Sequence, residues 1–412
     1  MNAFMTKEHL LSVVVLTSVG MAASAVQCAA ALPTYSVTRM SELVPVPLQI
    51  GAITNYAQRT FSVSGGIGGK SFVTGFADFN RLIGPPNPSF VTPREENYIT
   101  DPSNGTVLRH ITPPPGYETG IGGATRASTA GHVAYGVSDN RNDPNWLAGI
   151  EIARANPNGT VDVLTGLKGA EQRGVNALGQ VVAIGSDEAS TWRYTNGIGW
   201  QNLGALPGTS EAVPIGMNDL GTVVGRGTDS TGNPKPFYYT DSGGMQTFTD
   251  GAGNALFGEA SAVNNNGLIA GTANGRAFVF NGSTMEFTFL TPATDQKVTD
   301  VNSAGAILGV FYTPPILGFI PGNLGWIATK EDGFALRENL IAQDLGNPEW
   351  RINDAGDIND DGWILGTAYN FRDQLSYRVL LRPIPEPSSV LLAGMGGLWW
   401  ISRRRPIKRT GS

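Results

Sequence analysis

Residues 175–185 read VNALGQVVAIG, and the chain returns to this pattern several times. Each copy has an apolar residue, Asn, two further residues, Gly and a short apolar run that often ends in a second Gly. Good copies begin at Val175, Met217, Val263, Val301 and Ile358, and a weaker copy, ASTAGHVAYG, begins at Ala127 with Ser128 in the asparagine position. The asparagine positions are separated by 38 residues (Asn264 to Asn302) to 57 residues (Asn302 to Asn359). Repeats of this length indicate a propeller or a solenoid.

The repeat has the chemistry of a tight hairpin turn. Asn tolerates left-handed backbone and hydrogen-bonds its own turn, and Gly takes the positive φ that other residues resist. The apolar residues that follow predict a short buried strand. We therefore predict turn-forming residues rather than ligands at Asn176, Gly179, Asn218, Gly221, Asn264, Gly267, Asn302, Gly305, Asn359 and Gly362.

A second hairpin signal lies between the copies of the repeat. Residues 190–203 (STWRYTNGIGWQNL), 235–248 (KPFYYTDSGGMQTF) and 276–290 (RAFVFNGSTMEFTFL) each place a polar or glycine turn between two strand-forming runs. Such turns are the strongest local signal for a hairpin. Two hairpins in about 45 residues supply the four strands of one propeller blade.

These patterns predict an all-β fold, a β-propeller of six to seven four-stranded blades, with seven favoured and an open β-solenoid as the rival. The repeats occupy residues 116–383. Residues 32–115 form an N-terminal β region, in which KSFVTG from Lys70 and DPSNGTVLRHI from Asp101 are a degenerate first blade. The last unit lacks a strand, and TYSVTRM from Thr34 is expected to pair there and close the ring, which removes an exposed sheet edge.

The N-terminus has the pattern of a secretory signal peptide over residues 1–31. Lys7 precedes an apolar run at residues 10–19, and small residues follow at 23–25 and 29–31. We predict cleavage after Ala31, with Ala25 as the alternative. The only cysteine, Cys28, would be discarded with the signal, so no disulfide supports the exported fold.

The other end of the chain, residues 384–412, has three parts in a fixed order. Pro385, Glu386 and Pro387 come first, and an uncharged span follows at residues 388–401, short but apolar enough to enter a bilayer. A basic tail at residues 403–409 begins with Arg403, Arg404 and Arg405 and would stop at the cytoplasmic face. An ordinary C-terminal anchor and a buried hydrophobic helix are the alternatives.

This C-terminal arrangement resembles the PEP-CTERM sorting signal of Gram-negative bacteria, and the units over residues 120–380 resemble the HAF-type repeats of bacterial extracellular proteins. The resemblance implies a precursor held transiently in the inner membrane, cut by signal peptidase and by an exosortase near residues 385–387. The product would reach the cell surface or the extracellular space. Exopolysaccharide or another surface protein would be its partner there.

Charge excludes one class of partner. The chain carries a net charge of −6; Lys7 and Glu8 cancel in the signal peptide, and five basic residues leave with the tail, so the mature charge is −11. Nucleic-acid binding needs a positive face, so we predict no nucleic-acid partner.

Two short motifs suggest ligands. Residues 64–71 (SGGIGGKS) resemble a phosphate-binding loop, but Ser64 replaces the first glycine, and we interpret the stretch as a glycine turn between strands. Asp357, Asn359 and Asp361 alternate before Gly362, as in the first half of a calcium loop, although Ala368 stands where the loop needs a bidentate glutamate. Apart from this calcium alternative, no cofactor is predicted.

No catalytic motif is present, and we predict a non-enzymatic binding or structural protein. The mature chain has two histidines, His110 and His132, without a nucleophile motif or a zinc-binding helix. The alternative is a propeller-type glycan lyase or hydrolase exported by the same route. Such an enzyme would use two carboxylates about 5–9 Å apart in the channel. The candidate residues are Glu95, Glu96, Glu151 and Glu188. A channel filled with apolar side chains would instead favour a binding function. Sugar-stacking or core roles are open to Trp146, Trp192, Trp200, Trp326, Trp350 and Trp363.

Overall fold

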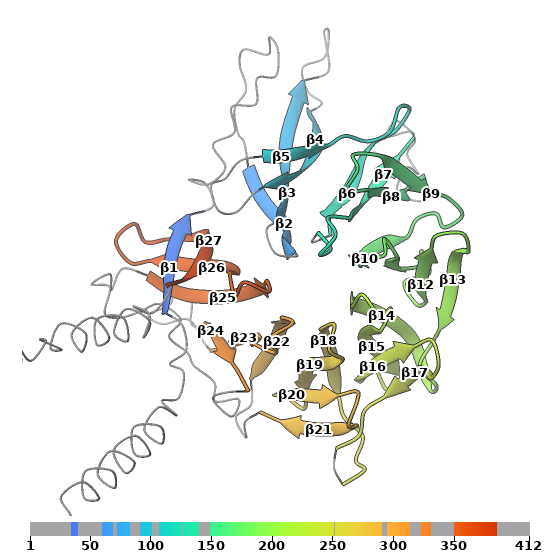
Figure 1. Ribbon diagram of the computed structural model, residues 1–412, viewed down its shortest axis with the longest axis vertical. Coiled ribbons are helices and arrows are strands. Elements are labelled where there is room, and N and C mark those ends of the chain that lie inside the picture. Colours follow the sequence, from blue (N-terminus) through green and yellow to red (C-terminus); the bar gives the residue numbers. More distant parts are fainter. Residues whose placement is uncertain are drawn as a thin grey trace, which may run out of the picture.

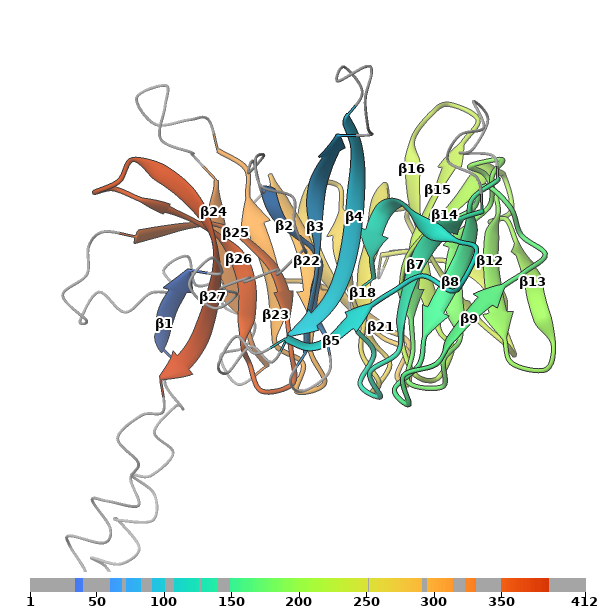
Figure 2. The same cartoon turned by 90° about the horizontal axis from the view of Figure 1, so that it is seen from above.

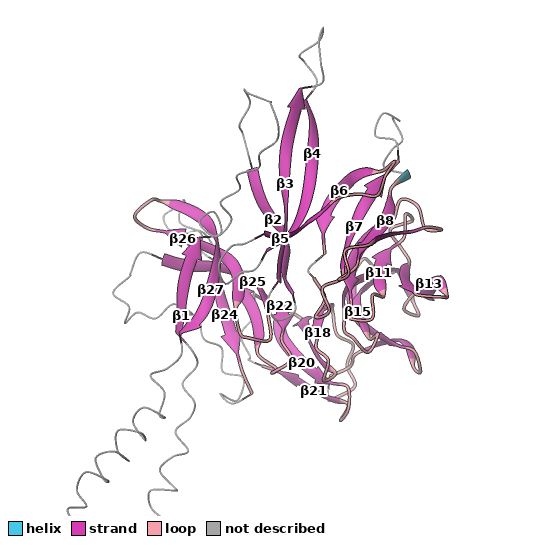
Figure 3. Cartoon of the chain, turned by 45° about the horizontal axis from the view of Figure 1, so that its top comes forward, coloured by secondary structure: helices cyan, strands magenta, loops and turns pink. Residues whose placement is uncertain are grey.

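The computed structural model describes residues 34–39, 60–68, 72–82, 91–100, 107–125, 127–139, 149–250, 252–290, 295–313, 323–330 and 350–384. All of its named elements are strands, β1 to β27 (Figure 3). The predicted signal peptide, sorting motif, apolar span and basic tail lie outside the described residues. Within the described ranges, no helix is long and apolar enough to cross a membrane.

The strands form seven antiparallel sheets, numbered here as blades 1 to 7 in chain order. Blade 1 contains β2 (Thr60–Gly68), β3 (Phe72–Leu82), β4 (Val91–Thr100) and β5 (Val107–Ile111). Blade 2 contains β6 (Glu118–Ala124), β7 (Val133–Ser138), β8 (Glu151–Ala155) and β9 (Val161–Leu164). Blade 3 contains β10 (Glu171–Val175), β11 (Val181–Ile184), β12 (Thr191–Thr195) and β13 (Gly199–Gly204). Blade 4 contains β14 (Thr209–Met217), β15 (Val223–Asp229), β16 (Pro234–Thr240) and β17 (Gly244–Thr247).

The remaining blades complete a circle, in which the first strand of each blade lies nearest the centre (Figure 1). Blade 5 contains β18 (Gly258–Val263), β19 (Leu268–Ala273), β20 (Arg276–Asn281) and β21 (Glu286–Phe289). Blade 6 has three described strands, β22 (Gln296–Val301), β23 (Ile307–Phe311) and β24 (Leu324–Ala328). Blade 7 contains β25 (Trp350–Ile358), β26 (Ile364–Asn370), β27 (Leu375–Ile384) and β1 (Thr34–Arg39). The described residues therefore form a β-propeller, as predicted.

The hydrophobic core lies between the blades. In β11, Val181 and Ala183 pack against Ala134 and Ile152 of blade 2. Val182 points the other way and packs with Ala212 and Val223 of blade 4. Successive side chains of a strand point to opposite faces of its sheet, so a strand between two neighbours is buried on both. This explains why the repeat ends in a continuous apolar run instead of an alternating one.

The N-terminal strand closes the ring. β1 pairs antiparallel with β27 over six residue pairs, from Thr34↔Ile384 to Arg39↔Val379. Tyr35 is 1% exposed and packs in the core of blade 7 with Ile352 and Leu381. The closing strand expected at Thr34 therefore supplies the strand that the last unit lacks.

The second glycine of the repeat lets an aromatic side chain cross the sheet. Gly309 pairs with Trp326, and a Cβ at Gly309 would lie 2.1 Å from the Trp326 ring and 2.4 Å from the Lys297 carbonyl oxygen. Gly271 has the same relation to Phe278, whose ring would lie 2.7 Å from a Cβ at that glycine. Only a residue without a side chain fits these places, which accounts for the glycine that ends most copies of the repeat.

Blade 1 differs from the others in shape. Its β3 and β4 have 11 and 10 residues, and they extend beyond the neighbouring strands in the side view (Figure 2). Residues 64–68, interpreted from the sequence as part of a turn, instead belong to β2, whose register against β3 shifts between Ser62 and Gly66. That interpretation was wrong because glycines inside a strand mark a bulge as readily as a turn.

Candidate functional site in the central channel

The repeat asparagines form turns of one geometry between the first and second strands of their blades. The Asn264 carboxamide oxygen accepts hydrogen bonds from the backbone N–H groups of Asn266 (3.0 Å) and Leu268 (3.0 Å). Gly267 follows with a φ of 78°. The same turn forms at Asn176, Asn218, Asn302 and Asn359. These residues thus lie where turn-formers were expected.

The asparagines also link each blade to the next. The Nδ2 group of Asn264 donates a hydrogen bond to the backbone oxygen of Asn302, the equivalent residue of the next blade, at 2.9 Å. The other three links are Asn176 to Asn218 (3.2 Å), Asn218 to Asn264 (2.9 Å) and Asn302 to Asn359 (3.1 Å). We call this chain of bonds through blades 3 to 7 the asparagine ladder. Each member is at most 5% exposed, so every carboxamide has a buried and satisfied position.

The linking role was missed from the sequence, although a signal for it was present. Asp or Gly would also fit the turn, yet all five good copies have Asn, whose side chain both accepts and donates. Turn formation itself uses only the oxygen of the carboxamide, although at Asn176 the amide nitrogen also donates to Gln180 (2.7 Å). The ladder partner of the amide nitrogen lies in another blade, 38 to 57 residues away.

A second set of cross-blade bonds runs beside the ladder. The backbone N–H of Ala177 donates to the Asp219 carboxylate (2.6 Å), and that of Ser303 donates to Asp360 (2.9 Å). Asp219 in turn donates its backbone N–H to the Asn265 carboxamide oxygen at 2.9 Å. The residue after each ladder asparagine is therefore used to hold its neighbour in place.

A β-bulge precedes the turn in several inner strands, three residues before the asparagine. The strand register skips Arg173, Ile215 and Ser261 in blades 3, 4 and 5. A bulge redirects a side chain, and all three of these residues line the central pocket. The bulge position differs from blade to blade in size and charge, whereas the asparagine does not.

These features surround a pocket of about 200 Å³ at the turn end of the channel, hereafter the channel pocket. It is lined by residues from blades 2 to 7, with Ser128, Asn218, Asn264, Asn302 and Asn359 among them. Its charged lining residues are Arg173, Asp219, Asp300 and Asp360. Asp300 is 2% exposed and accepts a hydrogen bond from the Ile358 backbone at 3.0 Å. The pocket is lined by polar groups. An apolar channel, which would have favoured a binding function over catalysis, is therefore not present at this end of the described structure.

Two buried arginines clamp neighbouring blades outside the ladder. Arg154 of blade 2 donates to the backbone oxygen of Gly179, in the turn of blade 3, and to the Asp162 carboxylate at 2.8 Å. Arg193 of blade 3 makes the equivalent bond to Gly221 of blade 4, at 3.3 Å. A hydrogen bond from Asn156 and the charge of Arg154 hold the pKa of Asp162 below its usual value.

The residues of the calcium motif lie at the end of β25 and in the turn that follows it in blade 7. Asp357 lies in β25, Asn359 is buried, and Asp361 is exposed. The Asn359 carboxamide oxygen accepts the Trp363 backbone N–H at 2.8 Å, as the repeat requires. Among the residues that the structure describes, no group of three His, Cys, Asp or Glu side chains is arranged to hold a metal ion.

The residues considered for catalysis do not converge on the channel pocket. His132 contacts Asn156 through Nδ1 (3.1 Å), and burial, aided by the charge of Arg154, lowers its pKa. Glu151 accepts a hydrogen bond from the Tyr117 hydroxyl (3.1 Å), and Glu188 lies in the turn after β11. His110, Glu95 and Glu96 belong to strands of blade 1. His132, Glu151 and Glu188 do not line the pocket, and the side chains of His110, Glu95 and Glu96 lie outside the described part of the structure.

The described tryptophans serve packing. Trp326 is fully buried, and Trp192, Trp200 and Trp350 pack against blade cores. The Trp363 ring lies 5.1 Å from the Arg382 guanidinium. None of them lines the channel pocket, and Trp146 lies outside the described residues.

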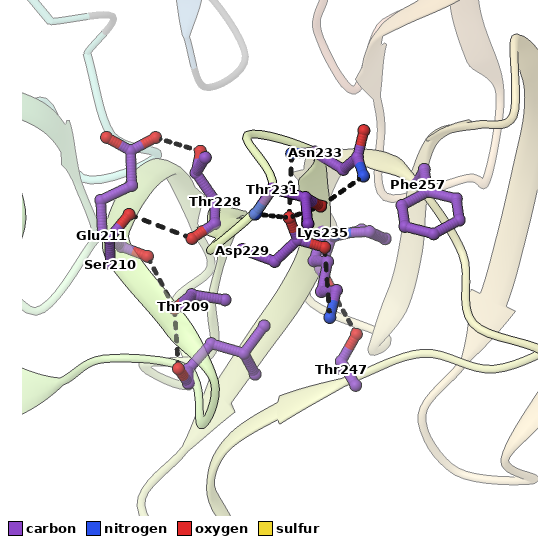
Figure 4. Close-up of polar contacts among 12 residues, drawn as sticks. Thr209, Ser210, Glu211, Thr228, Asp229, Thr231, Asn233, Lys235, Thr247 and Phe257 are labelled. Carbon is purple, nitrogen blue, oxygen red and sulfur yellow. Dashed lines mark hydrogen bonds and ion pairs between the residues drawn. The ribbon is translucent and has the colours of Figure 1, made fainter.

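The opposite end of blade 4 has its own polar cluster (Figure 4). Asp229 accepts hydrogen bonds from the Thr231 hydroxyl (2.6 Å) and from the backbone of Asn233 (3.0 Å). These bonds lower the pKa of Asp229 to about 2. Thr228 donates to Glu211, so both carboxylates already have partners and stabilise the turn.

Comparison with known proteins adds support for the fold. No protein-family model and no curated protein matches the chain. Among solved structures, the chain is similar to the β-propeller domain of the Trilobed protease from Pyrococcus furiosus, with a TM-score of 0.50 and 11% identity over 79% of this chain and 94% of that one. That domain is described as having an open velcro topology, whereas here β1 closes the last blade.

Two further structures are similar at lower scores. Acylaminoacyl peptidase from Pyrococcus horikoshii gives a TM-score of 0.49 at 12% identity, over 82% of this chain and 54% of that one. A streptogramin B lyase gives 0.49 at 11% identity, over 85% and 98%. At such identities, the likeness to the Pyrococcus furiosus domain defines the class of fold, a β-propeller, and nothing of its activity.

Proposed function

We propose that this chain is an exported β-propeller of the PEP-CTERM type, which acts at the cell surface or in the extracellular matrix by binding exopolysaccharide or another surface protein. One observation carries the proposal. The first described strand begins at Thr34, and the last strand ends at Ile384, paired with Thr34. Cuts after Ala31 and near residues 385–387 would therefore remove both sorting segments and leave every described strand in place.

The hydrogen bonds of the acidic residues in the channel favour a binding function over catalysis. Asp219 accepts hydrogen bonds from the Ala177 backbone, the Thr129 hydroxyl and the Asn265 carboxamide. Asp300 and Asp360 accept backbone N–H groups from neighbouring strands and turns. A general acid or base must be free to exchange its proton with a substrate. Asp219 and Asp300 instead hold the wall of the channel together, and among the described lining carboxylates Asp360 alone keeps an oxygen for a ligand, whereas cleavage of a glycan would need two such groups.

The sorting part of the proposal is tested by the intact mass of the protein recovered from the membrane, surface and medium fractions of its host. A species that starts near Leu32 and ends near Pro387 is expected in the surface or medium fraction. A species that keeps the arginine tail in every fraction would mean a permanently anchored periplasmic protein. Replacing Pro385, Glu386 and Pro387 together by alanine is the control and should keep the tail in the membrane fraction.

A further inference from the structure

The channel pocket is unequal in charge. Among the described lining residues, three are acidic, Asp219, Asp300 and Asp360, and one, Arg173, is basic. Arg173 also forms a salt bridge with the Glu171 carboxylate at 2.9 Å, which offsets its positive charge. A cleft lined by one sign of charge concentrates its field and attracts ligands of the opposite sign. The pocket is therefore suited to a cationic or neutral guest and disfavours an anion.

The pocket also offers hydrogen-bonding groups that the fold does not use. Ser261, at the bulge of blade 5, is 5% exposed, and its hydroxyl has no hydrogen-bond partner among the described residues. A buried hydroxyl without a partner is costly and points to a guest that supplies one. Asp360 uses one carboxylate oxygen for the Ser303 N–H, and its second oxygen accepts no further hydrogen bond from the part of the chain that the structure describes.

The volume of the pocket and the chemistry of its lining limit the class of ligand further. A pocket of about 200 Å³ holds several water molecules and therefore has room for a guest of the size of one sugar ring. The lining residues that the structure describes include no aromatic side chain, so the recognition that they offer rests on hydrogen bonds and charge. Carboxylate, carboxamide and hydroxyl groups from five blades line the pocket, and they suit a small ligand rich in hydroxyl groups.

We propose that the channel pocket binds a single amino-sugar residue with a free amine, presented by a polysaccharide. The ammonium group would be held by the negative wall that includes Asp360, through a charge-assisted hydrogen bond. A ring hydroxyl would satisfy Ser261. This inference rests on the proposed binding function and names its ligand class; a uronic acid, with its carboxylate, is the sugar that the pocket excludes.

The test is a calorimetric titration of the purified full chain with glucosamine, glucose and glucuronic acid at about pH 6, where the amine carries its proton. Glucosamine is expected to bind at least about tenfold more tightly than glucose, because it adds a charge-assisted bond, and glucuronic acid should not bind. Asp360→Asn should remove this preference, while its amide oxygen still accepts the Ser303 N–H. Ser261→Ala should weaken glucosamine and glucose alike.

Asp361→Asn is the matched control, because Asp361 is exposed in the same turn and does not line the pocket. Equal affinity for glucose and glucosamine, or equal loss in Asp361→Asn and Asp360→Asn, would overturn the inference. If no monosaccharide binds while the host polysaccharide still does, the pocket is not the binding site and the proposed function stands. If the polysaccharide fails as well, the proposed binding function fails with it.

Discussion

Blade 1 and blade 6 have the same glycine–aromatic strand pair, but only blade 6 has the asparagine of the repeat. In both, a glycine of the second strand faces an aromatic residue of the third: Gly75 pairs with Tyr98, and Gly309 with Trp326. Blade 6 then joins blade 7 through the amide of Asn302. Blade 1 has Gly69, Lys70 and Ser71 between its first two strands, a sequence without the asparagine of the repeat. Packing within a blade and linkage between blades are thus carried by different residues.

Blade 2 lies between these cases. Ser128 keeps the turn, since its hydroxyl accepts the His132 backbone N–H at 3.0 Å. Asn carries its acceptor and its donor on separate atoms, whereas Ser has one polar side-chain atom, and among the described residues the Ser128 hydroxyl makes no hydrogen bond to blade 3. The turn therefore survives the change from Asn to Ser, and the ladder begins only at Asn176.

The largest effect is expected from crowding the contact between Gly309 and Trp326 in blade 6. Gly309→Ala would place a methyl group against the Trp326 ring and a backbone oxygen, and we expect a loss of about 3 kcal/mol in the free energy of unfolding. Urea denaturation measures it. Gly149→Ala is the control, since nothing lies within 4 Å of its Cβ position. A loss no greater than that of the control would show that the glycine is not needed for packing.

The next effect separates linkage from turn formation. Asn264→Asp keeps the oxygen that accepts two backbone N–H groups but removes the donor to Asn302. We expect a loss of about 2 kcal/mol, because a buried carboxylate would then face a carbonyl oxygen. Ser128→Ala, which removes a turn bond without a link, should cost about 1 kcal/mol or less. Equal losses in urea denaturation would contradict the separate roles drawn from blades 1 and 6.

A third prediction concerns the seam at β1, the strand that completes blade 7 by pairing with β27. Burial raises the pKa of Tyr35 to about 12, from an ordinary value of 10.0. The folded state favours the neutral phenol, so its contribution is complete below pH 10 and is lost as the pH rises through 12. The wild type should lose roughly 2 to 3 kcal/mol more than Tyr35→Phe over this range. Parallel alkaline unfolding curves for the two proteins would show that β1 does not bury this ring.

The smallest effect is expected at the exposed end of blade 4, far from both types of contact. The pKa of Asp229 lies at about 2, lowered first by the Thr231 hydroxyl and then by the Asn233 backbone. Its stabilising effect is present above pH 3.8 and is lost as the pH falls through 2. Nuclear magnetic resonance titration of the carboxylate should show this midpoint in the wild type. Thr231→Val should move the midpoint upward, whereas Thr249→Val, at another turn, should leave it unchanged.

Much of the fold could be predicted because each blade has a local signature. Asn176 and Gly179 specify a turn by their own backbone preferences, and the apolar run after them needs only a buried strand. The strand at Thr34 was predicted by counting strands in the last unit. Residues 64–68 were misinterpreted because their glycines fit a turn and a bulged strand equally well.

The site could be predicted only in part, because it depends on contacts between blades. The donor of Asn264 and the acceptor on Asn302 are 38 residues apart, and no local pattern shows that they meet. Ser261 reaches the channel because the strand has a bulge at this position. The sequence around Ser261 does not predict that bulge. The channel pocket combines residues from six blades, and only the closed ring brings them together.

The pairing of Thr34 with Ile384 gives the ring a mechanical seam. Both strand ends leave the propeller at this pair, so a pull on the chain beyond Ile384 acts on one end of the β1–β27 ladder. The force would separate the six residue pairs one after another, starting at Thr34 and Ile384. It would not load all six pairs in shear at the same time. A tether attached there would thus open the propeller at its seam under low force, before it strained the blades that the asparagines join.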